Sequence, residues 1–147
     1  MTTRSLLFGS GDTSRLVDVG LLILRVGFGL ALAFAHGLSK IPPSEGFVGA
    51  TAALGFPLPT LFAWAAGLSE FVGGLLLAVG LLTRPAGVFI AITLGVAGFV
   101  QHAGDPFGDR ELALAYFAVG VAFAVMGAGR YSADAAIRRR DPSHVYT

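Results

Sequence analysis

The sequence predicts an all-α membrane protein: an antiparallel bundle of four transmembrane helices, with a short interfacial helix between the first helix and the second. Of the 147 residues, 54% are hydrophobic and only 13% are charged. The mean hydropathy of +0.75 makes the chain far more apolar than an ordinary soluble domain. The apolar residues gather in four runs, each close to the roughly 20 residues that a membrane-spanning helix needs.

The four runs predict helices at residues 17–38, 60–82, 85–100 with a weaker extension to His102, and 111–128. Between the second and third runs, the tight turn LLTRPAG places Pro85 in the first turn of the next helix, where proline is favoured. Within the connector 41–59, the stretch SEGFVGATAALGF is bounded by prolines and predicts the short interfacial helix. In the next outer connector, Asp105 or Asp109 is expected to cap the fourth helix.

Positive charges are distributed unevenly over the two ends of the predicted bundle. One end carries Arg4, Arg15, Arg84, Arg130, Arg138, Arg139 and Arg140, and the other carries Lys40 and Arg110. Because cytoplasmic loops carry the excess of lysine and arginine, both termini are predicted to be cytoplasmic, in a multi-pass protein of the inner (plasma) membrane. The chain then divides into a cytoplasmic segment (1–16), a four-helix transmembrane domain (17–130) and a basic cytoplasmic tail (131–147). The apolar patch near the N-terminus is too short for a signal peptide.

Several kinds of site are excluded by composition. The chain has no cysteine, which rules out disulfides, thiolate catalysis and cysteine-ligated metals. Of its three histidines, His144 lies in the tail, at the opposite end from His36 and His102, so no metal site is predicted. The sequence has no glycine-rich nucleotide loop, and no cofactor of its own and no nucleic-acid partner are expected.

Small residues recur at every fourth position in three of the predicted helices: Gly29–Ala33–Gly37, Gly87–Ala91–Gly95 and Gly120–Ala124–Ala128. Stripes of this kind let membrane helices approach closely, so they indicate which face of each helix points into the bundle. Glu70 is the only ionisable residue between positions 61 and 82, and it shares a helix face with Gly67 and Gly74. Glu70 is therefore predicted to point at neighbouring helices.

A buried carboxylate needs a partner, and the first helix offers Arg25. At 1.5 Å per residue, Arg25 lies about 12 Å and Glu70 about 18 Å from the cytoplasmic side, a difference that an arginine side chain can bridge. Charges inside a helix bundle are normally paired, so we predict a buried ion pair between Arg25 and Glu70. Whether such a pair only sets helix register or also serves chemistry is left open by the sequence.

A second polar group is predicted near the outer surface. His36, Lys40, His102 and Glu111 come from three helices at one depth, on faces at or near the bundle interior. Polar groups that converge beside an apolar cleft are the default site hypothesis, so these four are candidates for ligand binding or a proton relay. Singly, each has a simpler explanation: Lys40 extends to the headgroups, Glu111 lies at a helix N-terminus, and His102 contacts interfacial water.

Several of these residues also carry a family resemblance. They comprise Arg25, His36–Gly37, Lys40, GFPLP at 55–59, GLSEFVGG at 67–74, VGLLTR at 79–84, His102 and GAGRYSAD at 127–134. Together they resemble the DoxX family, and the closing GxGRYSxD is the most specific part. The sequence departs from the family pattern at Ala128, where proline is frequent, and at Ala133, where leucine is frequent. The resemblance implies a four-helix inner-membrane protein, and some relatives are subunits of quinone-linked systems, including thiosulfate:quinone oxidoreductase, or partners in redox-stress complexes.

The leading functional hypothesis is a redox-associated subunit that binds a quinone or a similar apolar ring compound near the outer face. His36 and His102 would contact the ring oxygens, and Lys40 and Glu111 would exchange protons with the outer aqueous phase; histidine suits this role because its charge changes near neutral pH. Electrons would come from a redox partner protein. A haem held by the two histidines is a minor variant of this hypothesis.

Two other functions fit the same sequence. The alternative is a non-enzymatic membrane scaffold or assembly factor, which the glycine-rich faces and the basic tail would serve. A third hypothesis is a small-solute or proton pathway lined by Arg25, Glu70 and the outer polar group, for which four helices are few unless the protein forms homo-oligomers. The sequence does not decide between an enzyme and a non-enzyme, and beyond the lipid bilayer it identifies no partner.

Overall fold

The computed structural model describes residues 14–139, which form helices and turns and no strand. The helices in chain order are α2 (Arg15–Ala31), continued by a π-helical turn η1 (Leu32–Gly37) and a 3-10 turn η2 (Leu38–Lys40), then α3 (Glu45–Ala53), α4 (Pro59–Val79), α5 (Thr83–Val96), continued by a π-helical turn η3 (Ala97–Gln101), α6 (Phe107–Met126) and α7 (Ala133–Arg139).

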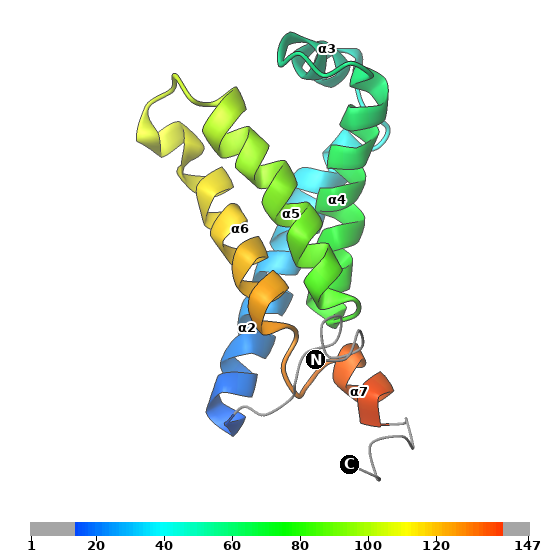
Figure 1. The fold of residues 1–147 in the computed structure, drawn as a ribbon, viewed down its shortest axis with the longest axis vertical. Helices are drawn as coiled ribbons and strands as arrows, with labels where there is room; N and C mark the ends of the chain where they lie inside the picture. The colour runs from blue at the N-terminus through cyan, green and yellow to red at the C-terminus, as the bar shows by residue number, and fades with distance from the viewer. Residues whose placement is uncertain (1–13, 140–147) are drawn as a thin grey trace.

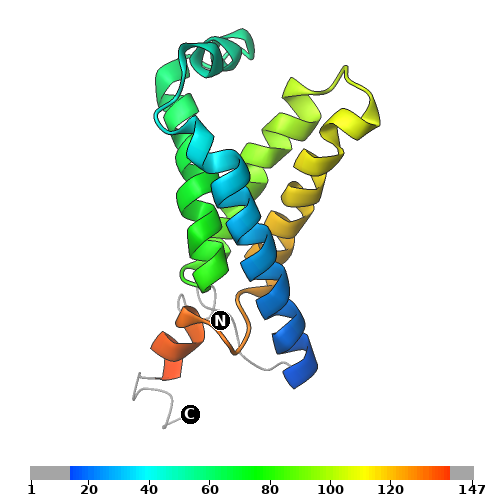
Figure 2. The same ribbon diagram turned by 180° about the vertical axis from the view of Figure 1, so that it is seen from behind.

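The four long helices alternate in direction along the chain (Figure 1). The close backbone contacts join α2 to α4, α4 to α5, and α5 to α6, and Figure 2 shows α2 from behind, crossing the other helices. Two ends of the molecule follow from this topology. The α3 end holds α3 and the connector between η3 and α6, whereas the α7 end holds α7 and the turn between α4 and α5.

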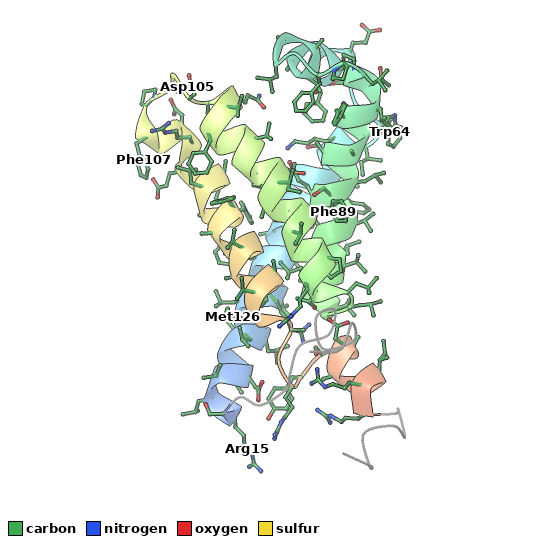
Figure 3. All side chains as sticks on the ribbon, viewed as in Figure 1. Arg15, Trp64, Phe89, Asp105, Phe107 and Met126 are labelled. Carbon is green, nitrogen blue, oxygen red and sulfur yellow. The ribbon has the colours of Figure 1, made fainter. Side chains whose placement is uncertain are left out.

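Three helical stretches among the described residues are long and apolar enough to cross a membrane: Arg15–Lys40, Pro59–Val79 and Thr83–Gln101. The 20-residue α6 has a similar length, but its first five residues include Asp109, Arg110 and Glu111. Large apolar side chains cover the outside of the molecule (Figure 3), among them Leu16, Ile23, Phe89, Ile92 and Val125, each at least 60% exposed. Such a surface is suited to contact with lipid rather than water.

Small residues allow the two closest helix pairs to form. A Cβ on Gly29 would lie 2.6 Å from the carbonyl oxygen of Gly74, and one on Gly87 would lie 2.7 Å from that of Gly120. Both distances are shorter than any real contact, so backbone meets backbone at these positions. The predicted inward faces of the first, third and fourth runs are thus confirmed as contact faces.

Each predicted run overlaps one of the four long helices along most of its length. The short helix predicted in the connector 41–59 is α3. One cap was predicted wrongly: Pro106, and neither Asp105 nor Asp109, occupies the N-cap of α6. Asp105 is instead engaged by a histidine in the same connector. The positions Arg4, Arg140 and His144 lie outside the described residues, and the orientation of the chain in a membrane stays a prediction.

Candidate functional site

The Glu70 carboxylate lies in the interior of the molecule and is paired with a lysine. Glu70 is 2% exposed, and the Lys40 Nζ lies 2.6 Å from its Oε1 and 2.7 Å from its Oε2. Lys40 is the last residue of η2, and its ammonium also lies 5.6 Å from the centre of the Phe47 ring on α3. The prediction that Glu70 points inward is confirmed, whereas the predicted Arg25–Glu70 ion pair is wrong.

Helix register explains why lysine and not arginine reaches Glu70. Gly37 packs directly on the backbone of Glu70 and Phe71, and Gly29 packs on Gly74 and Ala78. Because α2 and α4 are antiparallel, Lys40 comes next to Glu70, and Arg25 falls beyond Ala78 at the other end of the interface. A Cβ on Gly67 would lie 2.9 Å from the carbonyl oxygen of Lys40. The absence of a side chain at Gly67 therefore lets η2 pack closely against α4.

Arg25 belongs to a separate cluster at the α7 end. Arg25 is 2% exposed, and its guanidinium donates to the carbonyl oxygens of Ala78, at 2.9 Å, and of Tyr131. The Asp134 carboxylate accepts from the backbone N–H groups of Leu82, at 2.7 Å, and Thr83, at 3.0 Å. Asp134 thereby satisfies donors that the N-terminus of α5 would otherwise leave unpaired.

Asp18 completes this cluster. Its Oδ1 accepts from the backbone N–H of Arg130 at 2.8 Å, and the Asp18 side chain is 0% exposed. We call Asp18, Arg25 and Asp134 the tail clamp, because they fasten the segment GAGRYSAD to α2, to the end of α4 and to the start of α5. The most specific motif of the sequence therefore has a structural explanation.

The other predicted site residues lie in three separate places. The ring of His36 meets the Tyr116 ring edge-on, with ring centres 5.6 Å apart. His102 Nδ1 lies 2.7 Å from Asp105 Oδ2 in the connector before α6, and Glu111 is exposed in the first two turns of α6. Between residues 14 and 139, no hydrogen bond, ion pair or ring contact joins any two of the four residues that the sequence grouped together.

A cavity of about 270 Å³ lies between α3, α4 and α5, and the Lys40–Glu70 pair forms part of its wall. Its lining is mostly apolar and includes four phenylalanines, Phe47, Phe56, Phe62 and Phe89; Figure 3 labels Phe89 on α5. The sequence alone could not show that phenylalanines from α3, α4, α5 and the connector before α4 surround a single cavity.

Three hydroxyl-bearing residues, Thr51, Ser69 and Thr93, also line the cavity, and the sequence prediction missed all of them. The Ser69 Oγ is buried and has no hydrogen-bond partner within the described part of the chain. Thr93 faces the cavity from α5 and is the only polar residue between positions 85 and 100, which is the one signal that pointed to it. A buried polar atom without a partner is costly, so Ser69 marks a place where a ligand atom would be stabilised.

This arrangement has a definite chemical character. Aromatic side chains provide large flat apolar surfaces against which another ring can pack. Ser69 supplies a hydroxyl that can donate or accept, while Lys40 and Glu70 place a charge pair beside the apolar wall. Apolar pockets with a few convergent polar groups are typical of small-molecule sites. Over residues 14–139 no group of three histidine or acidic side chains is positioned to hold a metal ion.

Comparisons with known proteins place these features in a wider context. The family model DoxX matches residues 20–103. The "Putative oxidoreductase CatD" of Bacillus subtilis (strain 168) is 38% identical over 95 residues, which cover 64% of this chain and 69% of that protein. The "Inner membrane protein YphA" of Escherichia coli (strain K12) is 36% identical over 105 residues, or 67% of this chain and 74% of that protein. No solved structure has a significant match.

Proposed function

The chain belongs to the DoxX family, and from this premise we propose that it is an inner-membrane protein that binds a small apolar ring compound. The proposed site is the cavity between α3, α4 and α5, and a quinone is the leading candidate for the ligand. One observation carries this proposal: the wall of an aromatic-lined cavity contains both an ion pair with a buried carboxylate and a buried hydroxyl without a partner.

A quinone matches each part of that cavity. Its ring would pack among the phenylalanines, and one carbonyl oxygen would accept a hydrogen bond from the Ser69 hydroxyl. Reduction of a quinone to a quinol takes two electrons and two protons. In this proposal a redox partner protein supplies the electrons. Protons pass from the aqueous phase by way of Lys40, whose side chain is 31% exposed.

The proposal includes an arrangement in the membrane. All four long helices span it, α3 lies at the outer interface, and both termini are cytoplasmic. Support for a spanning α6 comes from its close packing along α5. Support for the orientation comes from arginines at the α7 end, since cytoplasmic surfaces carry the positive excess. The relative named as an inner membrane protein supports the location, and the name of CatD supports a redox role.

The direct experiment is to purify the protein from its native membrane in mild detergent, extract the bound small molecules and identify them by mass spectrometry. We expect the wild-type protein to retain a quinone or a related ring compound. The matched variants are Ala66→Phe, which fills the cavity from α4, and Ala118→Phe, which adds the same ring to an exposed position of α6 outside the cavity. Ala66→Phe should lose the retained compound and Ala118→Phe should keep it; equal retention in both would reject the site.

A scaffold function is the alternative, and α7 is the feature that favours it. The tail clamp holds α7 in place through Asp134, while Ile137 and Arg139 are exposed on it. A scaffold that recruits partners through α7 would lose co-purifying proteins in an Ile137→Glu, Arg139→Glu variant and would contain no ring compound. Ring-compound retention that is unchanged in this variant, with no loss of partners, would favour the ligand-binding proposal.

A further inference from the structure

The cavity between α3, α4 and α5 is bordered on one side by side chains that face the surroundings of the molecule. Phe62 on α4 is 38% exposed, and Phe89 and Ile92 on α5 are 61% and 60% exposed, although all three line the cavity. Phe89 and Ile92 lie within a stretch that is long and apolar enough to cross a membrane. This lateral rim between α4 and α5 therefore meets acyl chains rather than water.

The opposite parts of the cavity are covered. Phe47 and Thr51 of α3, together with Leu54 directly after it, close the cavity toward the α3 end. Thr51 is 7% exposed, and its hydroxyl is bonded to the Phe47 carbonyl oxygen of its own helix. The wall on the side of α2 and η2 carries Lys40 and Glu70. The charged pair thus lies in the wall next to η2, whereas the three exposed side chains of the lateral rim, Phe62, Phe89 and Ile92, are apolar.

The volume of the cavity limits what it can enclose. At about 270 Å³, it falls just below the usual range of roughly 300–1,000 Å³ for small-molecule pockets. A single ring with its substituents fits such a space, whereas a long hydrocarbon tail does not. The hydrocarbon tail of a ligand would have to extend out of the cavity. At the lateral rim it would extend among lipid chains, where its methylene groups are not exposed to water and carry no hydration cost.

We infer, building on the function proposed above, that the ligand is a membrane-dissolved amphiphile that enters sideways from the bilayer between Phe62 on α4 and Phe89 and Ile92 on α5. Its polar ring lies beside Ser69 and the Lys40–Glu70 pair, and its apolar tail stays among the lipid chains. A water-soluble ring compound that enters from the aqueous side is the competing source, and Gln101, which is exposed at the margin of the cavity, marks the route it would take.

A photoreactive quinone tests the path of the tail. The probe is a 1,4-benzoquinone with a decyl chain that carries a diazirine near its end, added to the protein in lipid nanodiscs and irradiated. Unmodified decylbenzoquinone serves as the competitor, and adducts are mapped by mass spectrometry. We expect the adducts that the competitor suppresses to fall on Phe62, Phe89, Ile92 or their immediate neighbours. Suppressed adducts on α3 or on residues 101–106 would overturn lateral entry and leave ligand binding intact.

Two tryptophan variants test the same path by kinetics. Ile92→Trp narrows the rim, and Val88→Trp places the same side chain on α5 at a 46% exposed position outside the cavity. We expect Ile92→Trp to slow the exchange of bound decylbenzoquinone by about fivefold, because a narrower opening slows release as well as entry along the same route. Val88→Trp should leave exchange unchanged. Equal exchange in both variants would overturn the proposed entry route. An absence of bound quinone in the wild-type protein would instead overturn the proposed function itself.

Discussion

Two buried polar clusters on the same helix face differ in what surrounds them. Arg25 and Lys40 both extend from the first helical segment toward α4. Arg25 ends in the tail clamp, where backbone groups of α4 and of the tail accept its hydrogen bonds. Lys40 ends at Glu70, in the wall of a cavity that also holds the unpartnered hydroxyl of Ser69.

The difference separates a structural role from a binding role. In the tail clamp, charged side chains are matched to backbone groups that a chain turn or a helix start leaves unpaired, so the cluster stabilises the fold. The Lys40–Glu70 pair instead adjoins empty apolar space. Buried polar atoms without a hydrogen-bond partner occur in both regions, Ser69 Oγ beside the pair and Arg25 Nε in the tail clamp, so they do not separate the two clusters. Both clusters contain buried charged residues, so burial alone does not distinguish a binding site from a structural cluster in this protein. The distinguishing feature is the cavity beside the Lys40–Glu70 pair.

The largest expected effect comes from breaking the tail clamp. Asp134→Ala removes the acceptor for the N–H groups of Leu82 and Thr83. We expect the free energy of unfolding to fall by about 4 kcal/mol, since each bond joins a backbone donor to a charged group. Thermal unfolding of the purified protein measures the loss. Asp109→Ala, which removes an exposed carboxylate from the first turn of α6, is the control and should change stability by less than about 0.5 kcal/mol.

The second effect comes from unpairing Glu70. Lys40→Met leaves a buried carboxylate without its cation, and we expect a loss of about 3 kcal/mol, because a charge is costly to bury alone. The double variant Lys40→Met, Glu70→Gln removes both charges and should recover most of this stability, which a double-mutant cycle would quantify. If the double variant is no more stable than Lys40→Met, the ion pair is not what makes Lys40 important.

The sequence was sufficient to predict the four long helices and α3, the inward faces of the long helices and the burial of Glu70, but not α7, which lies in the predicted basic tail. The length of an apolar run and the spacing of small residues are local properties of the sequence, so they can be read without knowledge of the tertiary contacts. The partner of Glu70 could not be predicted from such local properties. Which cation meets Glu70 depends on the register of α2 and its continuation η1–η2 against α4, which Gly37 and Gly67 set through backbone contacts. The depth estimate from the sequence did not capture that register.

The cavity was not predictable for a related reason. It exists because α3 folds back over α4 and brings Phe47 near the ammonium of Lys40, and no local pattern specifies where a short connector helix will rest. The predicted grouping of His36, Lys40, His102 and Glu111 assumed that equal depth means contact. In the structure, His102 is instead engaged by Asp105, three residues along the chain.

A smaller effect tests the binding site without disturbing the fold. Ser69→Ala removes a hydroxyl that has no partner in the described chain, so the melting temperature of the ligand-free protein should not fall. Affinity for decylbenzoquinone should drop by about fivefold, the equivalent of one hydrogen bond of about 1 kcal/mol. Ser39→Ala, which lies outside the cavity, is the control for affinity and should leave it unchanged. An unaltered affinity in Ser69→Ala would remove this hydroxyl from the site.

The smallest effect distinguishes the cavity from the outer histidines. Neither His36 nor His102 lines the cavity, and His102 lies in a connector where Asp105 engages its ring. We therefore expect His102→Ala to change the affinity for decylbenzoquinone by less than about twofold, within the range of a remote substitution, when binding is titrated beside Ser69→Ala. A loss in His102→Ala larger than that in Ser69→Ala would reverse the comparison: the ligand would then rest on the outer histidines that the sequence favoured, and the space beside the Lys40–Glu70 pair would be only a packing gap.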